Sequence, residues 1–472
     1  MVWRFLERTG AQAVALIVSV VLARILSPED YGTIALITVF INILNVFVDS
    51  GLGTALIQKK DADNIDFSSV FYTNIVFCTV LYAMMFVAAP LLADFYRNER
   101  LTSIIRVLSV TILISGVKNV QHAYVSKTLQ FRKFFFATLA GTIAAAVVGI
   151  WMAYHRFGVW ALVAQQVTNI AVDTVLLWLT VKWRPTLVFS LKRLRRLFVY
   201  GWRLLVSALL DTCYANLRNL IIGKKYTSKD LAFYTKGELF PKTVVGNINS
   251  AIDSVLLPAM SAEQDDRERV KQMTRRAIKT STFCIAPLMM GLAACAQNVV
   301  HILLTDKWLF CVPYMRIFCI TYMFYPIHTA NLNAIKAMGR SDLFLRLEIM
   351  KKIVGLAVLL TTMWFGVMVM AYSLLLTSVL CQIINSWPNK RLLNYGYLEQ
   401  LKDILPGIAL AVAMGIIVYF GIYIPIMESV QLIIQVVTGA FVFVCGSKLF
   451  RLEPYSYIRS IIKGKLVNKK DK

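Results

Sequence analysis

Long apolar stretches recur about every 30 residues from the start of the chain to its end. Each approaches the ~20 residues that a helix needs to cross the hydrocarbon core of a membrane. Helices fit this pattern better than a barrel, whose strands would be shorter and would alternate apolar with polar positions. The pattern predicts an all-α polytopic membrane protein with about 14 transmembrane helices, at approximately 9–26, 33–57, 67–90, 102–124, 134–154, 157–181, 197–222, 238–260, 277–300, 309–335, 344–366, 367–387, 404–424 and 430–450.

The chain also repeats itself. At an offset of 200 residues, Asp30 of LARILSPEDYGTIAL falls on Asp230 of IIGKKYTSKDLAFYTKGE, and the downstream segment SGLGTALI falls on SAIDSVLL. At an offset of 210, Arg106 of IRVLSVTIL falls on Arg316 of MRIFCITYM. Each copy stands within a set of six predicted helices. Because six is an even number, the second set keeps the topology of the first, and the repeats are parallel.

Parallel six-helix repeats are typical of transporters built from two lobes. We expect the lobes to be related by a pseudo-two-fold axis along the membrane normal, with the passage between them. The alternative is that the repeat records an old duplication and nothing more. The predicted parts are an N-lobe at 1–190, a C-lobe at 191–395, a C-terminal helix pair at 396–450 and a basic tail at 451–472.

Composition supports the membrane assignment. The 472 residues are 58% hydrophobic and only 16% charged, and the mean hydropathy is +0.64. Soluble domains are typically about 45–50% apolar and about a quarter charged. The remaining polar surface is too small to cover so many apolar helices in water, so a soluble protein is excluded.

The positive charges indicate the orientation in the membrane. Lys and Arg gather in alternate loops, such as KWRPTLVFSLKRLRR at 182–196 and AEQDDRERVKQMTRRAIK at 262–279, and in the tail. Since cytoplasmic loops carry the excess of Lys and Arg, both termini are predicted to be cytoplasmic. Four lysines in an opposite-side loop, Lys224, Lys225, Lys229 and Lys236, depart from this pattern. The net charge of +24 therefore reflects topology and attraction to anionic lipids; the cations form no single stripe of the kind that binds nucleic acid.

Cysteine and histidine point to no special chemistry. The eight cysteines form no CxxC pair, most of them fall inside predicted spans, and the four histidines are scattered. Buried cysteine behaves as a small apolar side chain. We expect no disulfide, no metal site, no cofactor and no catalytic residues.

Ionisable residues inside the predicted spans are the candidates for a site, because charge is costly in lipid and normally faces the protein interior or water. Some of them share a helix face: Arg203, Asp211 and Arg218 fall within an arc of roughly 80° on the seventh helix, calculated at 100° per residue. Together these positions predict a polar chamber with substrate-binding candidates Arg203, Arg218, Lys242, Lys118, Arg24, Arg316, Asn42, Asn45 and Asn249, and with coupling or charge-balancing candidates Asp49, Asp211 and Asp253.

Each candidate also has a purely structural interpretation. Arg203 and Arg218 could snorkel to lipid head groups, and Asp211 could simply neutralise one of them. Asp49 and Asp253 could hydrogen-bond to neighbouring helices. Arg316, near a helix end, could hold its helix in position instead of binding a ligand, and Arg24 could pack against the SPEDYG turn. Lys242 is the better candidate for a cavity because it lies deeper in its predicted helix.

Several motifs resemble one known family. LxRxLxPEDYG after the first helix, FRKFFFATLAG at 131–141, YANLRNLIIGKKYTSKDLAFYTKGELFP at 214–241 and AIKAMGRSDLFLRLEIMKK at 334–352 stand in the order seen in polysaccharide flippases of the Wzx type. These flippases belong to the multidrug/oligosaccharidyl-lipid/polysaccharide exporter superfamily. The likeness extends over essentially the whole chain.

The resemblance implies a function. Members of this family move an undecaprenyl-pyrophosphate-linked oligosaccharide repeat unit across the bacterial plasma membrane by alternating access. It further implies contact with membrane lipids and work alongside a polysaccharide polymerase and chain-length machinery. A cationic chamber suits a pyrophosphate, since Arg offers a planar fork to phosphate oxygens, and the last two helices could shape a groove for the lipid tail.

Rival functions remain at this stage. A lipid II-type or multidrug exporter of the same superfamily would share the architecture, and a membrane-embedded glycan polymerase or ligase would handle similar lipids. Against the last, no predicted loop on the outer side exceeds roughly 20 residues. The energy source is open among proton, sodium ion, membrane potential and mass action.

Overall fold

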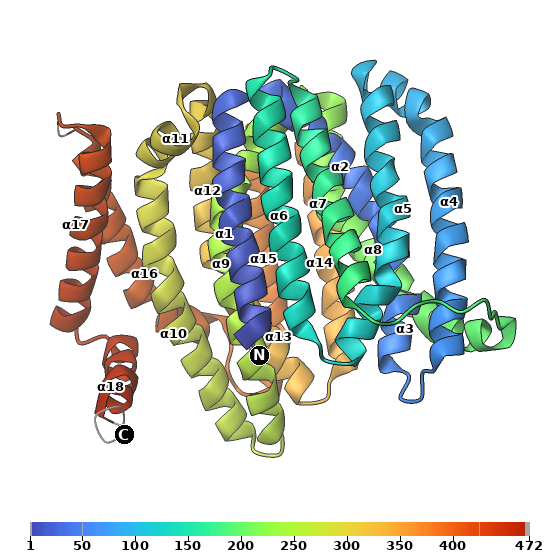
Figure 1. Ribbon diagram of the computed structural model, residues 1–472. Coiled ribbons are helices and arrows are strands. Elements are labelled where there is room, and N and C mark those ends of the chain that lie inside the picture. Colours follow the sequence, from blue (N-terminus) through green and yellow to red (C-terminus); the bar gives the residue numbers. More distant parts are fainter. Residues whose placement is uncertain (1, 50, 424, 468–472) are drawn as a thin grey trace. The chain divides into compact units, whose positions relative to one another are not determined.

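The structure, a computed structural model, describes residues 2–49, 51–423 and 425–467. The described residues form helices and short connections, with no strand. Fourteen stretches are long enough to cross a membrane (Figure 1): α1 (Val2–Ile25), α2 (Pro28–Asp49), α4 (Asn64–Phe95), α5 (Arg100–Lys127), α6 (Phe131–Tyr154), α7 (Val159–Thr180), α8 (Leu191–Lys225), α9 (Ser228–Ala262), α10 (Arg267–Ala294), α12 (Val312–Met323) joined to α13 (Tyr325–Ala337), α14 (Ser341–Thr362), α15 (Val367–Leu392), α16 (Tyr397–Phe420) and α17 (Glu428–Leu449). The all-α polytopic membrane fold predicted from the sequence is confirmed.

Shorter helices interrupt three of the predicted spans. The second predicted helix ends at Asp49, and the separate helix α3 (Leu52–Gln58) follows it. The ninth divides into α10 and α11 (Ala296–Leu304), and the tenth breaks between α12 and α13 at Phe324. The remaining short elements are η1 (Asp306–Cys311), η2 (Gly421–Tyr423) and α18 (Glu453–Val467).

Ten of the described segments are both long and apolar enough to count as membrane spans by length and composition. The four long helices outside that group are α1, α8, α9 and α14. The apolar part of α1, Gly10–Ile25, is shorter than any of these ten spans. The helices α8, α9 and α14 carry many charged residues along their length. Because charge in a spanning helix avoids lipid, these three helices are the first places to look for a site.

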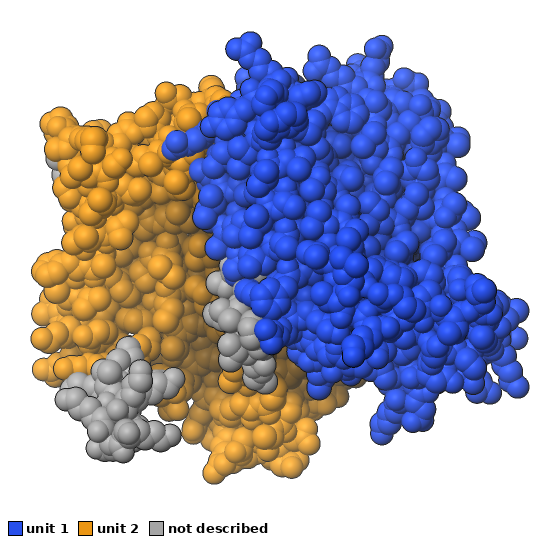
Figure 2. Space-filling view, in the orientation of Figure 1, with its two compact units in different colours: residues 1–232 blue, residues 233–472 orange. Residues whose placement is uncertain are grey.

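The chain divides into two compact units, Met1–Ala232 and Phe233–Lys472 (Figure 2). This division falls inside α9 and leaves α8 with the first unit, because α8 packs on α2, α3 and α4. The lobes predicted from the repeat, 1–190 and 191–395, are defined by sequence similarity instead of by contacts, and they stay a prediction.

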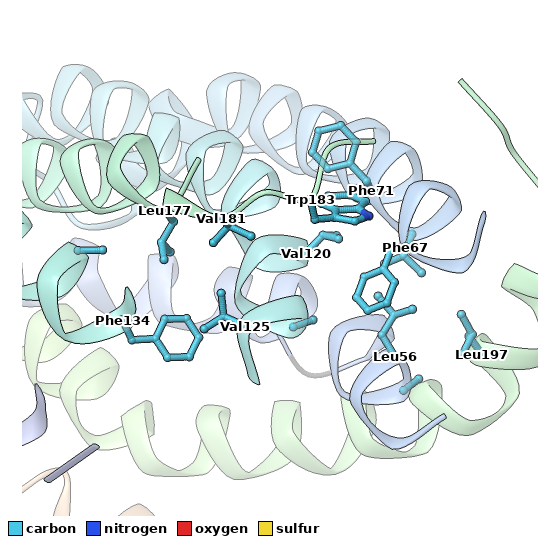
Figure 3. Close-up of a cluster of buried hydrophobic side chains, with 14 residues drawn as sticks. Leu56, Phe67, Phe71, Val120, Val125, Phe134, Leu177, Val181, Trp183 and Leu197 are labelled. Atoms are coloured by element: carbon cyan, nitrogen blue, oxygen red, sulfur yellow. The ribbon is translucent and has the colours of Figure 1, made fainter. Parts of the chain in front are cut away.

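In the first unit, α6 lies between α1 and α7. A stripe of small residues on α6 lets the helices approach closely, as small residues do at interfaces between membrane helices. A Cβ atom added to Gly141 would lie only 2.9 Å from the carbonyl oxygen of Asn169 on α7. At the other end of the unit, a buried aromatic cluster joins α3, α4, α5, α6, α7 and α8, with Trp183 packed against Phe67 and Phe71 (Figure 3).

The α2–α8 pair is antiparallel and very tight. A Cβ atom at Gly201 would lie 2.7 Å from the carbonyl oxygen of Gly51, and one at Gly223 would lie 2.7 Å from the side chain of Leu36. Close to the start of α2, a Cβ atom at Gly32 would fall 1.7 Å from the carbonyl oxygen of Ser228, which no side chain could tolerate. Glycine is therefore needed at Gly32 and Gly201, where an added Cβ would meet backbone atoms.

In the second unit, α10 packs against α12, α13 and α16, and α15 covers α12, α13 and α14. Buried side chains of α9, α10, α13 and α16 form its apolar cluster, which includes Met260, Ile278, Ile327 and Tyr395. An amide cluster attaches α17: the side chain of Asn298 on α11 donates to Gln431 and Gln435 at 2.8 and 2.9 Å.

The sequence repeat reappears in local geometry. At the start of α2, Asp30 accepts hydrogen bonds from the backbone N–H and the hydroxyl of Ser27, whose hydroxyl accepts in turn from the backbone of Asp30. At the start of α9, Thr227 and Asp230 make the same three bonds. Both are capping boxes, which satisfy backbone donors that a helix start leaves free.

Candidate functional site: polar faces within the two units

The first unit places two polar helices side by side, α2 and α8. On α8, Arg203 and Asp211 are exposed and Arg218 is buried, with 9% of its surface exposed. On α2, Asn42 is exposed, while the amide oxygen of Asn45 is buried with no hydrogen-bond partner among the described residues. The side chain of Asp49 lies outside the described part of the structure.

Lys118 on α5 is paired with Asp173 on α7, with 2.6 Å between the ammonium nitrogen and a carboxylate oxygen. Asp173 is buried and its second oxygen has no hydrogen-bond partner among the described residues. Pairing lowers the free-energy cost that either charge would carry alone in a low-dielectric region. The ion pair of Lys118 therefore joins two helices of the first unit, α5 and α7.

In the second unit, Lys242 is exposed at its tip and pairs with Glu238 one turn earlier on α9, at 3.2 Å. Glu238 also accepts a 2.6 Å hydrogen bond from the hydroxyl of Tyr322 on α12. The carboxylate is mostly covered, with 20% of its side chain exposed. Lys242 is therefore paired with the carboxylate of Glu238, which the hydrogen bond from Tyr322 holds in place.

Farther along α9, Asp253 accepts a 2.8 Å hydrogen bond from the side-chain amide of Asn333 on α13. Asn249, one turn before it, has a buried amide oxygen with no hydrogen-bond partner among the described residues. The oxygens of Asn249 and of Asn45 are chemically alike, because each is a buried amide acceptor with no hydrogen-bond partner among the described residues.

Arg316 on α12 and Arg106 on α5 behave as a matched pair. Each donates from Nε to a backbone carbonyl of a neighbouring helix at 3.3 Å, Arg106 to Phe86 and Arg316 to Ala293. Each guanidinium also lies over an aromatic ring, at 4.2 Å for Arg106 and 5.3 Å for Arg316. This geometry favours a positional role for Arg316, although its Nη2 is buried with no hydrogen-bond partner among the described residues. Arg24, near the end of α1, is exposed.

The predicted outer end of the first unit holds a polar pocket of about 440 Å³. Residues at the starts of α2, α5, α7 and α9 line it, among them Glu29, Arg100 and Lys229. Glu29 and Lys229 approach to 3.7 Å, next to the contact between Gly32 and Ser228. The two copies of the repeated motif therefore meet at this end.

Sequence reasoning missed several polar partners. Asp173 and Glu238 pair with predicted residues, yet they escaped notice because a single carboxylate in a long apolar run has no local signal for its partner. Asn331, a polar position of the tenth predicted helix, is fully buried and bonded to Asn389 and Gln400. Its amide joins α13, α15 and α16 and is unavailable to a ligand.

Among the described residues, no three His, Cys, Asp or Glu side chains gather closely enough to hold a metal ion. The eight cysteines are free thiols. In the first unit, α2 and α8 therefore carry amides, carboxylates and cations, and in the second unit α9 carries Lys242, Asn249 and Asp253.

Comparison with known proteins now decides the family. Residues 21–313, well over half of the chain, match the family model described as polysaccharide biosynthesis protein. The chain belongs to this family. The family resemblance seen in the sequence motifs is confirmed.

Two curated relatives illustrate the family. The succinoglycan biosynthesis transport protein ExoT of Rhizobium meliloti is 25% identical over 319 residues, which cover 68% of this chain and 65% of that protein, slightly less than two thirds of it. The teichuronic acid biosynthesis protein TuaB of Bacillus subtilis is 24% identical over 443 residues, covering 91% of this chain and 89% of that protein.

Among solved structures, the lipid II flippase MurJ in an inward closed conformation has a TM-score of 0.78 to this chain. The match covers 95% of this chain and 99% of that chain at 12% identity. At such low identity the likeness establishes the fold alone: this family member has the fold of a multi-span membrane transporter.

Proposed function

We propose that this protein is a flippase that moves an undecaprenyl-pyrophosphate-linked oligosaccharide repeat unit across the bacterial plasma membrane for export of a surface polysaccharide. Membership of the polysaccharide biosynthesis family and the transporter fold support this role. The observation that carries it is the placement of membrane-depth cations and amides on the paired helices α2 and α8, with Arg218 almost completely buried. Charged residues inside a spanning segment normally face the protein interior or water, and an anionic lipid head group would pass through that same region.

The chemistry of the head group matches the residues. Arginine binds phosphate oxygens through two parallel N–H donors, which Arg203 and Arg218 supply. The oligosaccharide needs hydrogen-bond partners, and Asn42, Asn45 and Asn249 supply them. The protein breaks no bond of the substrate, so its role is transport and not catalysis.

We infer that both termini are cytoplasmic and that the membrane is the bacterial plasma membrane. The basic loops at 182–196 and 262–279 support this orientation. Substrate arrives from the cytoplasmic leaflet, and a polysaccharide polymerase with its chain-length machinery would use the product on the other side.

Alternating access would move the lobes 1–190 and 191–395 against each other, with the pair 396–450 beside them. The contact between Gly32 and Ser228 supports a closed state of the predicted outer end. Asp49, Asp211 and Asp253 are proposed to balance the charge of the cationic site or to couple its movement to an ion.

Deletion of the gene tests the function in cells. We expect one lipid-linked glycan to accumulate on the cytoplasmic face, and Arg203→Ala or Arg218→Ala to reproduce that accumulation while the protein remains in the membrane. Arg267→Ala, in an exposed position at the start of α10, is the matched control and should behave as wild type.

Three outcomes would count against the proposal. Normal surface glycan in both arginine variants would remove those residues from the site. Accumulation of lipid II, or drug sensitivity with normal glycans, would instead favour a lipid II-type or multidrug exporter.

A further inference from the structure

An apolar groove of about 360 Å³ runs along the first unit between α2, α3, α4 and the first third of α8. Nearly all of its lining is carbon. Four aromatic residues line it, Phe47, Phe77, Phe198 and Trp202, together with leucines that include Leu52 and with Thr73. The helix α8 contacts α3 and α4, and residues of these three helices line the groove together with Phe47 of α2.

The groove opens outward from the protein. Phe77, Phe198 and Trp202 each leave between 38% and 54% of their surface exposed. Apolar exposure continues along α8 through Val206 and Leu210. In a helix that crosses a membrane, this pattern places the groove mouth against hydrocarbon.

One end of the groove is cationic. Arg195 is part of its lining, and Lys192 and Arg196 are exposed close by in the sequence of α8. Arg193, by contrast, is already paired with Asp63 at 2.5 Å. This contact holds the pKa of Asp63 at about 2, so the pair stays charged at physiological pH and fixes the start of α8.

The three other cations have no carboxylate partner within salt-bridge distance among the described residues. An apolar groove that ends at cations without a carboxylate partner is complementary to a long hydrocarbon chain that ends in phosphate. The positive-inside pattern places this end at the cytoplasmic leaflet, where interfacial lysine and arginine attract anionic lipid heads.

We propose that this groove is the entry site for the polyprenyl chain of the lipid carrier, with Arg195 at the phosphate. The inference rests on the proposed function. The cationic end favours the carrier, which bears two phosphates, over a phospholipid with one, because added negative charge strengthens the attraction to Lys192, Arg195 and Arg196. A carrier held here has its chain in the slot and its head group beside the polar face of α2 and α8.

A second apolar pocket, of about 400 Å³, lies in the second unit and is lined by α9, α10, α16 and α17 residues. Its lining contains no cation, and Gln435 is its one residue with a polar side chain apart from a cysteine and methionines. It therefore lacks a partner for the phosphate, and it serves as the comparison site in the test.

The test is photo-crosslinking with the full-length protein in vesicles of phosphatidylethanolamine and phosphatidylglycerol. The probe is undecaprenyl pyrophosphate with a diazirine in its isoprenoid chain. We expect crosslinks within residues 191–205, and we expect unlabelled undecaprenyl pyrophosphate to compete for them while added phosphatidylglycerol does not.

A matched pair of variants on α4 sharpens the test. Thr73 lines the groove and Thr79 is exposed outside it, and each hydroxyl donates to the carbonyl four residues earlier at 2.8 Å. Thr73→Trp should lower crosslinking about tenfold or more, since excluding even two methylene groups from the slot costs that much binding. Thr79→Trp should leave it unchanged. If Thr73→Trp does not reach the membrane, Leu52→Trp fills the groove from the opposite wall.

A second pair of variants tests the cationic end of the groove. Arg195→Glu should weaken competition by unlabelled undecaprenyl pyrophosphate, and Arg196→Glu, outside the lining, should weaken it much less.

Equal labelling by a diazirine phosphatidylglycerol, without competition by undecaprenyl pyrophosphate, would overturn the proposal and make the groove a general lipid site. Crosslinks confined to residues 414–444 would overturn it in favour of the second pocket. Wild-type flipping by a Thr73→Trp protein that no longer crosslinks would reject the groove and leave the proposed function standing. Failure of the wild type to flip any carrier would instead reject the function.

Discussion

At the scale of single residues, the polar side chains of this protein divide into those used by the fold and those available to a ligand. Lys118 and Arg316 bind to groups within their own unit, a carboxylate in the first case and a carbonyl in the second. Asn45 and Asn249 keep an unsatisfied buried oxygen among the described residues. Sequence placed all four in one class, because residue type and helix face cannot reveal a partner on a distant helix.

The ion pair between Lys118 and Asp173 gives a prediction at this scale. Lys118→Met or Asp173→Asn alone should lower the stability of the protein by about 1–3 kcal/mol, because each leaves a charge with no partner between α5 and α7. The exposed part of Lys118 keeps the value below that of a fully buried pair. Thermal unfolding in detergent measures the loss. The charge swap Lys118→Asp with Asp173→Lys should recover part of it, and equal stability of all variants would show that the pair does not hold the helices.

At the scale of elements, the sequence predicted nearly every long helix, because apolar runs of membrane length have few other possible structures. It missed the breaks after Asp49, after Ala294 and at Phe324. Near the first of these, the backbone of Gly51 lies close to Gly201 of α8, a contact between distant segments that no local sequence pattern reveals. The polar starts of α2 and α9 were visible as a repeat, and the structure shows that both are capping boxes.

The two capping boxes should be energetically equivalent. Ser27→Ala and Thr227→Ala should each cost about 1 kcal/mol, since each removes the hydroxyl that satisfies a backbone donor at a helix start. The loss in the double variant should differ from the sum of the two, because both boxes line one pocket and neighbouring sites couple. Ser254→Ala, which removes only an exposed bond within α9, is the control and should be neutral. A large loss from one box with none from the other would contradict their equivalence.

Gly32 gives a second prediction for these elements. Gly32→Ala cannot be accommodated while Ser228 stays in place, so the variant should favour states in which the two helix starts separate. A cysteine at Thr33, which is buried here, should then react faster with an impermeant maleimide in a background without the native cysteines. Gly246→Ala, whose added Cβ would meet nothing within 4 Å, is the control. Unchanged reactivity in a folded Gly32→Ala protein would rule out this contact as an outer gate.

At the scale of the whole molecule, the family and the transporter fold were both visible in the sequence, since motif order and helix number are properties of the chain itself. The site was only partly predictable. The sequence placed candidate residues on α8 and α9, which, like α1 and α14, are not among the ten apolar spans of the described residues. It could not distinguish residues that bind substrate from residues that join helices, because that distinction depends on three-dimensional packing.

The most direct test of the account is flipping by purified protein. Vesicles would receive undecaprenyl-pyrophosphate-linked oligosaccharide in one leaflet, and an impermeant glycosidase or lectin would report its arrival in the other. We predict transfer well above that of protein-free vesicles, lost in the Arg203→Ala, Arg218→Ala double variant and kept in Arg267→Ala. Transfer no faster than in protein-free vesicles, or full transfer by the double variant, would contradict the claim that the arginines of α8 help an anionic lipid head across the membrane.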